Sequence, residues 1–316
     1  MKKLLFLINP VSGTSPGQVV AKLIHQELAD RLFPWQYDAI FTNGNTVEQA
    51  GELAGDYEAV VGVGGDGTFG QIVQAVAEME APPKLGVIPY GVGNDLARSL
   101  DVYHLFKNKG MPGIIDMLVK ARTRRMDVLR VDGEVLFSNY FGLGNDALVS
   151  NEFNRLRPRN LLSVMGSRSF VNTGLYGILI LENFTYEFPF SIRLVYTDRE
   201  GRELSTSVPS GSHGILVTNA GIYAGGAMIS SKCNLCDGRF EVTVIENMNQ
   251  WWLMHLTRFF KKPLDVLSPS VTQFQTNRLK IISDGQTFYQ MDGEKTTVSG
   301  GPTEITVGRQ MEVIIP

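Results

Sequence analysis

Two short segments of the chain place a carboxylate among glycines, each directly after an apolar run. Gly64-Gly65-Asp66-Gly67-Thr68 follows residues 59–63, and Pro89-Tyr90-Gly91-Val92-Gly93-Asn94-Asp95 follows residues 84–88. Glycines at a strand-to-helix turn let the backbone approach a phosphate, and the N–H groups that open the next helix can bind it. Acidic residues beside a phosphate make sense if a divalent cation bridges the carboxylate and phosphate oxygens. The two segments therefore indicate phosphoryl transfer from a nucleotide.

The elements that position these segments alternate between strand and helix. The continuous apolar run 4–8 is typical of a strand buried on both faces of a parallel sheet. A βαβα order predicts a doubly wound α/β domain, in which ligands bind beyond the carboxyl ends of the strands. The predicted helices and strands are helix 18–32, strand 35–41, a helix capped by Asn45 or Thr46 that ends at Leu53, and strand–turn–helix units over 59–79 and 84–100.

The pattern changes after Arg124, where short β-rich runs are separated by turn signals. Asp132-Gly133, Arg199-Glu200-Gly201 and Asp237-Gly238 are such signals. This part predicts an antiparallel β-sandwich or barrel, and residues 303–316 contain two further strand candidates. The predicted strands include 191–197, 214–219, 240–246 and 278–283.

Composition restricts the class of protein. The chain has 316 residues, of which 43% are hydrophobic and 19% are charged, and its net charge is −3. These values are typical of a globular protein with two domains, and the charge gives no basis for nucleic-acid binding. No apolar run approaches the roughly 20 residues that span a bilayer. We expect a cytoplasmic protein, with peripheral contact at the inner face of the membrane as an open alternative.

Five motifs in order resemble the diacylglycerol kinase catalytic domain family, in its soluble bacterial lipid-kinase form. Asn9-Pro10-Val11-Ser12-Gly13 resembles the family's opening nucleotide loop, and GGDGT at 64–68 resembles its central signature, which NAD kinases share. PYGVGNDLAR at 89–98 is more discriminating. Phe141–Ala147 resembles the following glycine-rich turn, and Met291-Asp292-Gly293-Glu294 resembles the catalytic DGE motif.

The resemblance implies an α/β ATP-binding domain over 1–129, to which 304–316 return, and a β-sandwich lipid-substrate domain over 130–303. The active site is then expected in the cleft between the two domains. The implied activity is transfer of the γ-phosphate of ATP to a hydroxyl of a diacylglycerol-like lipid, a step in phospholipid metabolism, with Mg²⁺ as cofactor.

The resemblance also implies roles for individual residues. Asp292 or Glu294 accepts the proton of the lipid hydroxyl, although a solvated β-turn is the alternative without the family match. Asp66 and Asp95 hold Mg²⁺, and Asp127 completes this acidic set or pairs with Arg125 or Arg130 instead. The nucleotide site is expected to be lined by Asn9, Pro10, Ser12, Gly13, Thr42, Gly64, Gly65, Asp66, Gly67, Thr68, Val92 and Asn94.

Two positions depart from the family pattern. The family usually has Thr where this chain has Val92, and a lost neutral hydrogen bond costs on the order of 1 kcal/mol. A second, structural Mg²⁺ site matches Asp237, Asn234 and the backbone carbonyl of Arg239, but Asn is a weaker ligand than a carboxylate. The neighbouring Cys233 and Cys236 form half a zinc site at most, so two reduced thiols in a turn are expected.

The segment 248–262 combines aromatic and basic side chains, which suits an anionic membrane surface. The alternative is a helix packed on the β domain with a solvated basic end. The partner is expected to be a lipid at a membrane surface. The sequence leaves the oligomeric state open, because an exposed edge strand can also pair in a homodimer. Two rival functions are an NAD kinase and a non-catalytic nucleotide- or lipid-binding protein.

Overall fold

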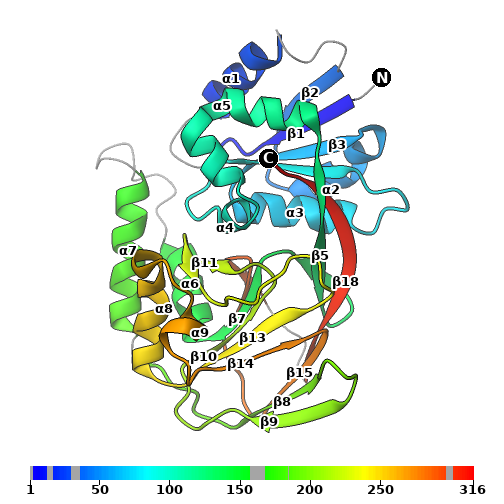
Figure 1. Cartoon of the computed structure of the whole chain (residues 1–316). Helices are drawn as coiled ribbons and strands as arrows, with labels where there is room; N and C mark the ends of the chain where they lie inside the picture. The colour runs from blue at the N-terminus through cyan, green and yellow to red at the C-terminus, as the bar shows by residue number, and fades with distance from the viewer. Residues whose placement is uncertain (1–2, 13–16, 30–35, 157–167, 184, 297–301) are drawn as a thin grey trace. The chain divides into compact units, whose positions relative to one another are not determined.

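The computed structural model describes residues 3–12, 17–29, 36–156, 168–183, 185–296 and 302–316. It contains two compact units, which we call unit 1 (Met1–Val128 with Arg309–Pro316) and unit 2 (Leu129–Gly308). Two strands, β5 (Thr123–Val131) and β18 (Thr303–Ile314), contribute residues to both units (Figure 1).

Unit 1 is built on a parallel sheet in which the strands lie in the order β2-β1-β3-β4. The central strand β1 is buried, as expected for a strand covered on both faces. The predicted strand–turn–helix rhythm is confirmed. Its elements are β1 (Lys3–Ile8), α1 (Gly17–Ala29), β2 (Gln36–Phe41), α2 (Thr46–Leu53), a 3-10 turn (Ala54–Asp56), β3 (Ala59–Gly64), α3 (Asp66–Val76), β4 (Lys84–Pro89), α4 (Asp95–Ser99) and α5 (Val102–Lys120).

The C-terminal part of β18 completes the sheet of unit 1. Val313 pairs in parallel with Leu85 of β4. The Arg309 guanidinium donates to the backbone carbonyls of Ala77 and Met79, at 3.2 and 2.6 Å. The prediction of two separate strands within 303–316 is wrong, because β18 is a single strand of 12 residues. Gly308 does not end it, since the residues on both sides are in extended, paired backbone.

Unit 2 contains two sets of antiparallel strands. One is a six-stranded sheet in the order β14-β13-β10-β7-β16-β17, and the other includes β9-β8-β15-β18 with the pair β5-β6. Buried side chains from both sets, such as Phe141, Phe240, Leu194 and Leu279, belong to one hydrophobic cluster. The strands are β6 (Val135–Phe137), β7 (Tyr140–Gly144), β8 (Ile192–Thr197), β9 (Glu203–Ser207), β10 (Gly214–Thr218), β11 (Ile222–Tyr223), β12 (Ala227–Met228), β13 (Phe240–Ile245), β14 (Thr272–Thr276), β15 (Arg278–Ser283), β16 (Tyr289–Met291) and β17 (Glu294–Thr296).

Unit 2 also contains helices, of which the sequence predicted only the one within 248–262, and that as an alternative. They are α6 (Asn145–Leu156), α7 (Arg168–Glu182), α8 (Met248–Phe260) and α9 (Leu264–Leu267). The helix α6 follows β7 without a loop, because Gly144 adopts a φ of +89° and turns the chain. No helix in the described part of the chain is long and apolar enough to cross a membrane.

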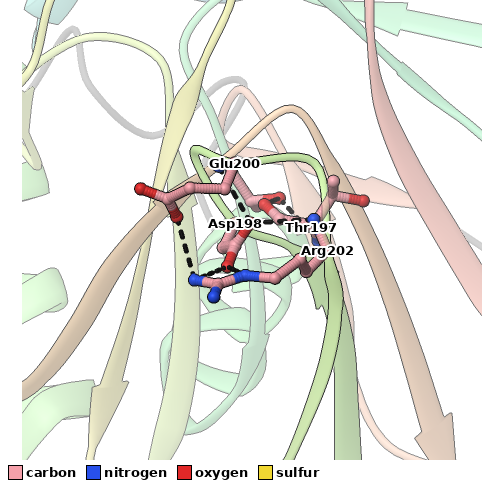
Figure 2. Close-up of polar contacts among 5 residues, drawn as sticks. Thr197, Asp198, Glu200 and Arg202 are labelled. Atoms are coloured by element: carbon pink, nitrogen blue, oxygen red, sulfur yellow. Dashed lines mark hydrogen bonds and ion pairs between the residues drawn. The ribbon is translucent and has the colours of Figure 1, made fainter.

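The turn between β8 and β9 shows how one acidic side chain organises a hairpin. Asp198 accepts hydrogen bonds from the backbone N–H of Glu200 and Arg202, at 2.9 and 2.8 Å, and from Arg202 Nε at 2.7 Å (Figure 2). Loss of hydration opposes ionisation, but the donors of Arg202 outweigh it and lower the pKa of Asp198. The turn signal at 199–201 is confirmed, with Gly201 at a φ of +82°.

The helix α8 buries a histidine among apolar side chains. The His255 ring lies edge-on to the Trp251 ring, with the centroids 4.8 Å apart, and both ring nitrogens are buried without a hydrogen-bond partner. Burial, and then the charge of Arg258, lowers the pKa of His255 to about 3. The folded protein therefore holds a neutral imidazole under conditions in which an exposed histidine is protonated.

We predict that His255→Phe stabilises unit 2 by about 1–3 kcal/mol, since it removes unpaired buried nitrogens. The folded-state pKa lies below the unfolded value, so wild-type stability falls as pH falls from about 6.5 towards 3. The gain should thus be larger near pH 5 than near pH 8 in urea denaturation. The exposed His104→Phe is the control, and an equal gain at both pH values would contradict this explanation.

Candidate functional site

The predicted nucleotide loops gather beyond the carboxyl ends of β1, β3 and β4. Asn9 Nδ2 donates to Thr68 Oγ1 at 2.9 Å, which joins the first loop to the start of α3. Ser12 Oγ lies 3.5 Å from the carbonyl of Tyr90, and the Tyr90 N–H donates to Gly64 O at 2.9 Å. Three loops that are distant in sequence are therefore joined by hydrogen bonds.

The loops that follow β3 and β4 approach so closely that only glycine fits. A Cβ built on Gly91 would lie 2.3 Å from Gly65 Cα, and one on Gly64 would lie 2.6 Å from Thr68 Oγ1. Real Cβ atoms do not make such contacts, so side chains are excluded at both positions. The surface formed here by Gly65 and Gly91 is made of backbone, as the binding of phosphate oxygens by N–H groups requires.

Asn94 closes the loop after β4. Its backbone is in the left-handed region, with a φ of 54°. Its side chain accepts from Gly91 N at 2.9 Å and donates to Gly91 O at 2.8 Å. Val92, at the tip of this loop, is 49% exposed. A valine at this position offers no hydrogen bond, which agrees with the departure noted in the sequence.

Asp66 and Asp95 lie side by side in unit 1. The Asp66 carboxylate accepts from the backbone N–H groups of Asp95 and Leu96, both at 3.0 Å. A Cβ built on Gly93 would lie 3.2 Å from Asp66 Oδ2 and 3.4 Å from Asp95 Oδ2. Two carboxylate oxygens therefore face one small space, and such oxygens are the ligands that Mg²⁺ takes. The residues present fit a magnesium ion.

The remaining predicted residues of unit 1 make contacts with other parts of the unit or lie outside its described part. Thr42 is buried, and its N–H donates to Ile8 O at 2.9 Å. Pro10 is close to Gly17, where a Cβ would lie 2.8 Å from Pro10 Cα. Asp127 is fully buried and accepts from Gln310 Nε2 at 2.8 Å. Gly13 lies outside the described residues.

Asp292 is held in unit 2 by a row of backbone donors. Its Oδ1 accepts from the N–H groups of Asn139 and Tyr140, at 2.9 and 3.0 Å. Its Oδ2 accepts from the N–H and hydroxyl of Ser138, at 3.0 and 3.3 Å. A carboxylate has about four acceptor positions, so these contacts use its capacity and stabilise the anion. The side chain of Glu294 lies outside what the structure describes.

Sequence reasoning missed a buried acid that is connected to the DGE turn. Asp146, at the start of α6, accepts from Gln290 Nε2 at 2.7 Å, and Gln290 Oε1 accepts from Gly293 N at 2.9 Å. Complete burial raises the pKa of Asp146 to about 7, although the bond from Gln290 opposes the rise. Gly142 leaves room for this pair, because its Cβ would lie 2.2 Å from Asp146 Oδ2. The acidic residue in the glycine-rich motif 141–147 was the available signal.

The predicted side-chain ligands of the second metal site accept hydrogen bonds from backbone N–H groups in their own turns. Asp237 Oδ1 accepts from Arg239 N at 3.1 Å, and Asn234 Oδ1 accepts from Cys236 N at 3.3 Å. Within the described ranges, no group of three or more His, Cys, Asp or Glu side chains is placed to hold a metal. The second Mg²⁺ site stays a prediction. Burial, together with the nearby Glu241, raises the pKa of the Cys233 thiol, which makes it unreactive.

Comparison with known proteins identifies the family. The diacylglycerol kinase catalytic domain model matches residues 3–131, and the diacylglycerol kinase accessory domain model matches residues 136–295. The chain belongs to the diacylglycerol kinase family.

Curated relatives and solved structures agree with the family assignment. A diacylglycerol kinase of Staphylococcus epidermidis is 25% identical over 303 residues, which cover 93% of this chain and 86% of the relative. One from Staphylococcus aureus is 24% identical over the same shares. A putative diacylglycerol kinase from Bacillus anthracis has a TM-score of 0.72 at 20% identity, over 100% of this chain and 97% of the other. The structural likeness supports the fold.

We predict that Asp146→Asn abolishes a pH-dependent part of the stability. The folded-state pKa of about 7 lies above the unfolded value near 3.8, so the native state retains a proton that the unfolded chain releases. Stability therefore falls as pH rises through this window, with a slope of up to about 1.4 kcal/mol per pH unit.

Asparagine cannot ionise but can still accept from Gln290. The variant should lack the slope and be more stable than wild type near pH 8, as measured by urea denaturation across the window. Asp284→Asn, in which an acid outside this hydrogen-bonded chain is changed, is the control. A slope that persists in Asp146→Asn would show that another group carries it.

Proposed function

We propose that the protein transfers the γ-phosphate of ATP to a hydroxyl of a diacylglycerol-like lipid. Membership of the diacylglycerol kinase family supports a lipid kinase. The observation that carries the proposal is that carboxylate oxygens of Asp66 and Asp95 both lie next to Gly93. Beside them, the glycine loops after β3 and β4 contact each other through their backbones.

Unit 1 is proposed to bind the nucleotide. Its glycine loops offer backbone N–H groups, which bind phosphate oxygens without the bulk of side chains. Asp66 and Asp95 would hold Mg²⁺, which neutralises charge on the transferring phosphoryl group when bound. Asp66 also accepts from Asp95 N and Leu96 N, so the Asp66 carboxylate is fixed relative to the backbone that carries Asp95.

Unit 2 is proposed to supply the lipid-binding part and the proton acceptor. The two sets of strands that share one core support the predicted β-sandwich. The lipid hydroxyl loses its proton as it attacks the phosphorus, and a carboxylate of the DGE motif accepts it. Because backbone donors occupy the Asp292 oxygens, Asp292 is proposed to fix the turn, and the other acid of the motif, Glu294, is proposed to accept the proton.

We predict that Asp95→Asn lowers turnover by at least about a hundredfold, since it removes one of two charged ligands at the metal position. The measurement is transfer of labelled γ-phosphate from ATP to diacylglycerol in mixed micelles with Mg²⁺. The exposed Asp116→Asn in unit 1 is the matched control. Asp95→Asn is preferable to Asp66→Ala, which also removes the acceptor of two backbone N–H groups.

The same assay separates the rival functions. Label on NAD instead of lipid would assign the chain to the NAD kinases. ATP binding without transfer to any lipid would favour a non-catalytic binder, for which the exposed Val92 is the relevant departure. Wild-type turnover in Asp95→Asn would contradict the proposed metal site.

We predict that Asp292→Asn and Glu294→Gln have different effects. Asparagine at 292 replaces an acceptor oxygen with an NH₂ group that faces N–H donors, which costs about 1–3 kcal/mol of stability along with turnover. Glu294→Gln should abolish turnover with little change in the urea midpoint. Full activity in Glu294→Gln would instead assign the proton to Asp292.

A further inference from the structure

The helix α8 has two faces of opposite environment within unit 2. One face is buried: Trp251 is 1% exposed, Met254 is fully buried, and both belong to a hydrophobic cluster with Leu264 of α9. The helix is fixed on this side, and its N-terminus is capped by the Asn247 side chain, which accepts from Gln250 N at 3.1 Å. The alternative that α8 packs on the β domain is thus correct for this face.

The other face is apolar and exposed. Trp252, Leu256, Phe259 and Phe260 are spaced at i, i+4, i+7 and i+8, which places them on one stripe of a helix. Their exposed fractions are 36%, 41%, 73% and 55%. Scattered apolar residues on a surface need no explanation, but four large ones on one stripe form a patch of the kind that marks an interaction site. We call these four residues the outer stripe of α8.

Basic residues lie at the C-terminal end of the outer stripe. Arg258, Lys261 and Lys262 are all exposed. No Asp or Glu occurs among residues 248–262, so this segment carries a formal charge of +3 in a chain whose net charge is −3. Arg258 also lies near the Phe259 ring, at 5.9 Å from its centroid. Aromatic side chains with cations beside them are the composition of helices that lie in the headgroup region of anionic bilayers.

We propose that the outer stripe of α8, with Arg258, Lys261 and Lys262, binds the surface of a membrane that contains anionic phospholipids. The proposal deepens the proposed function, because a kinase without a spanning helix in its described part must meet a lipid substrate at such a surface. A second copy of the chain is the less suitable occupant. A two-fold contact centred on the C-terminal end of the stripe, where Phe259 and Phe260 are most exposed, would bring two sets of three cations together.

The proposal is tested by sedimentation of the full chain with vesicles, in the absence of ATP. The vesicles are phosphatidylcholine alone or phosphatidylcholine mixed with phosphatidylglycerol. The wild type should bind the mixed vesicles, and its affinity should fall as salt is added. Both Phe259→Ser/Phe260→Ser and Lys261→Glu/Lys262→Glu should weaken binding by about tenfold or more.

Matched controls change similar side chains elsewhere in unit 2. Leu204→Ser alters an apolar residue on β9 that is 40% exposed, and Lys280→Glu reverses an exposed charge on β15. Both should bind vesicles as the wild type does. Equal losses in controls and α8 variants, wild-type affinity in the α8 variants, or no binding of the wild type to mixed vesicles would overturn the proposal.

Two further measurements distinguish membrane binding by α8 from the proposed kinase activity and from pairing with a second copy of the chain. The α8 variants should keep wild-type activity on diacylglycerol dispersed in detergent micelles, because none of the changed residues is assigned to the catalytic groups. If the α8 variants lose vesicle binding but keep normal activity in micelles, the result supports α8 as the membrane-binding surface. If the wild type binds vesicles but is inactive in micelles, the result contradicts only the proposed kinase activity. A dimer that the phenylalanine changes dissociate, without any vesicle binding, would identify a second copy as the occupant.

Discussion

A carboxylate that is removed from water must gain hydrogen-bond donors or retain its proton, and the functional parts of this protein depend on that constraint. Asp66 and Asp292 gain backbone N–H donors, two for the first and three for the second. Asp146 has a neutral amide as its partner, and its pKa rises to about 7. The same side chain is thus held by backbone donors in two places, and in a third its pKa lies near neutrality.

The hydrogen bonds of Asp66 and Asp292 also fix the backbone of the loops that they join. Asp66 lies at the start of α3, yet it binds the backbone that opens α4. Asp292 lies between β16 and β17, yet it binds the residues that precede and begin β7. In each case a carboxylate from one loop supplies the acceptor that backbone N–H groups of another loop lack. Residues that carry charge therefore also maintain the backbone around them, so a substitution affects stability and chemistry together.

The sequence predicted the elements of unit 1 well because its signals are local. Apolar runs, a glycine turn and the Asn45 cap each act within a few residues, and Asn45 does accept from Glu48 N. The partners of the site residues could not be predicted in this way. The contacts of Asp292 with residues 138–140, and of Asp127 with Gln310, join segments more than 150 residues apart. Tertiary packing alone determines such pairs.

The elements that were predicted wrongly from the sequence also depend on tertiary packing. In the sequence, residues 141–147 resemble a glycine-rich turn. In the structure, β7 pairs with β10 and β16, and α6 begins at the residue that follows the end of β7. Likewise, β18 is continuous because its two halves pair with different strands, β15 and β4. For segment 248–262 the sequence left two alternatives open, and the structure shows a helix with one buried face.

The discontinuity of unit 1 has a consequence for the order of events during synthesis. Arg309–Pro316 belong to this unit, where Val313 pairs with β4 and Arg309 binds carbonyls after α3. A ribosome makes unit 2 in its entirety before it reaches these residues. The first sheet to emerge must therefore wait, with one side of β4 unpaired, while some 180 residues are added. Unit 2 can finish folding while unit 1 is still incomplete, so the middle of the nascent chain can complete its fold before the N-terminal part does.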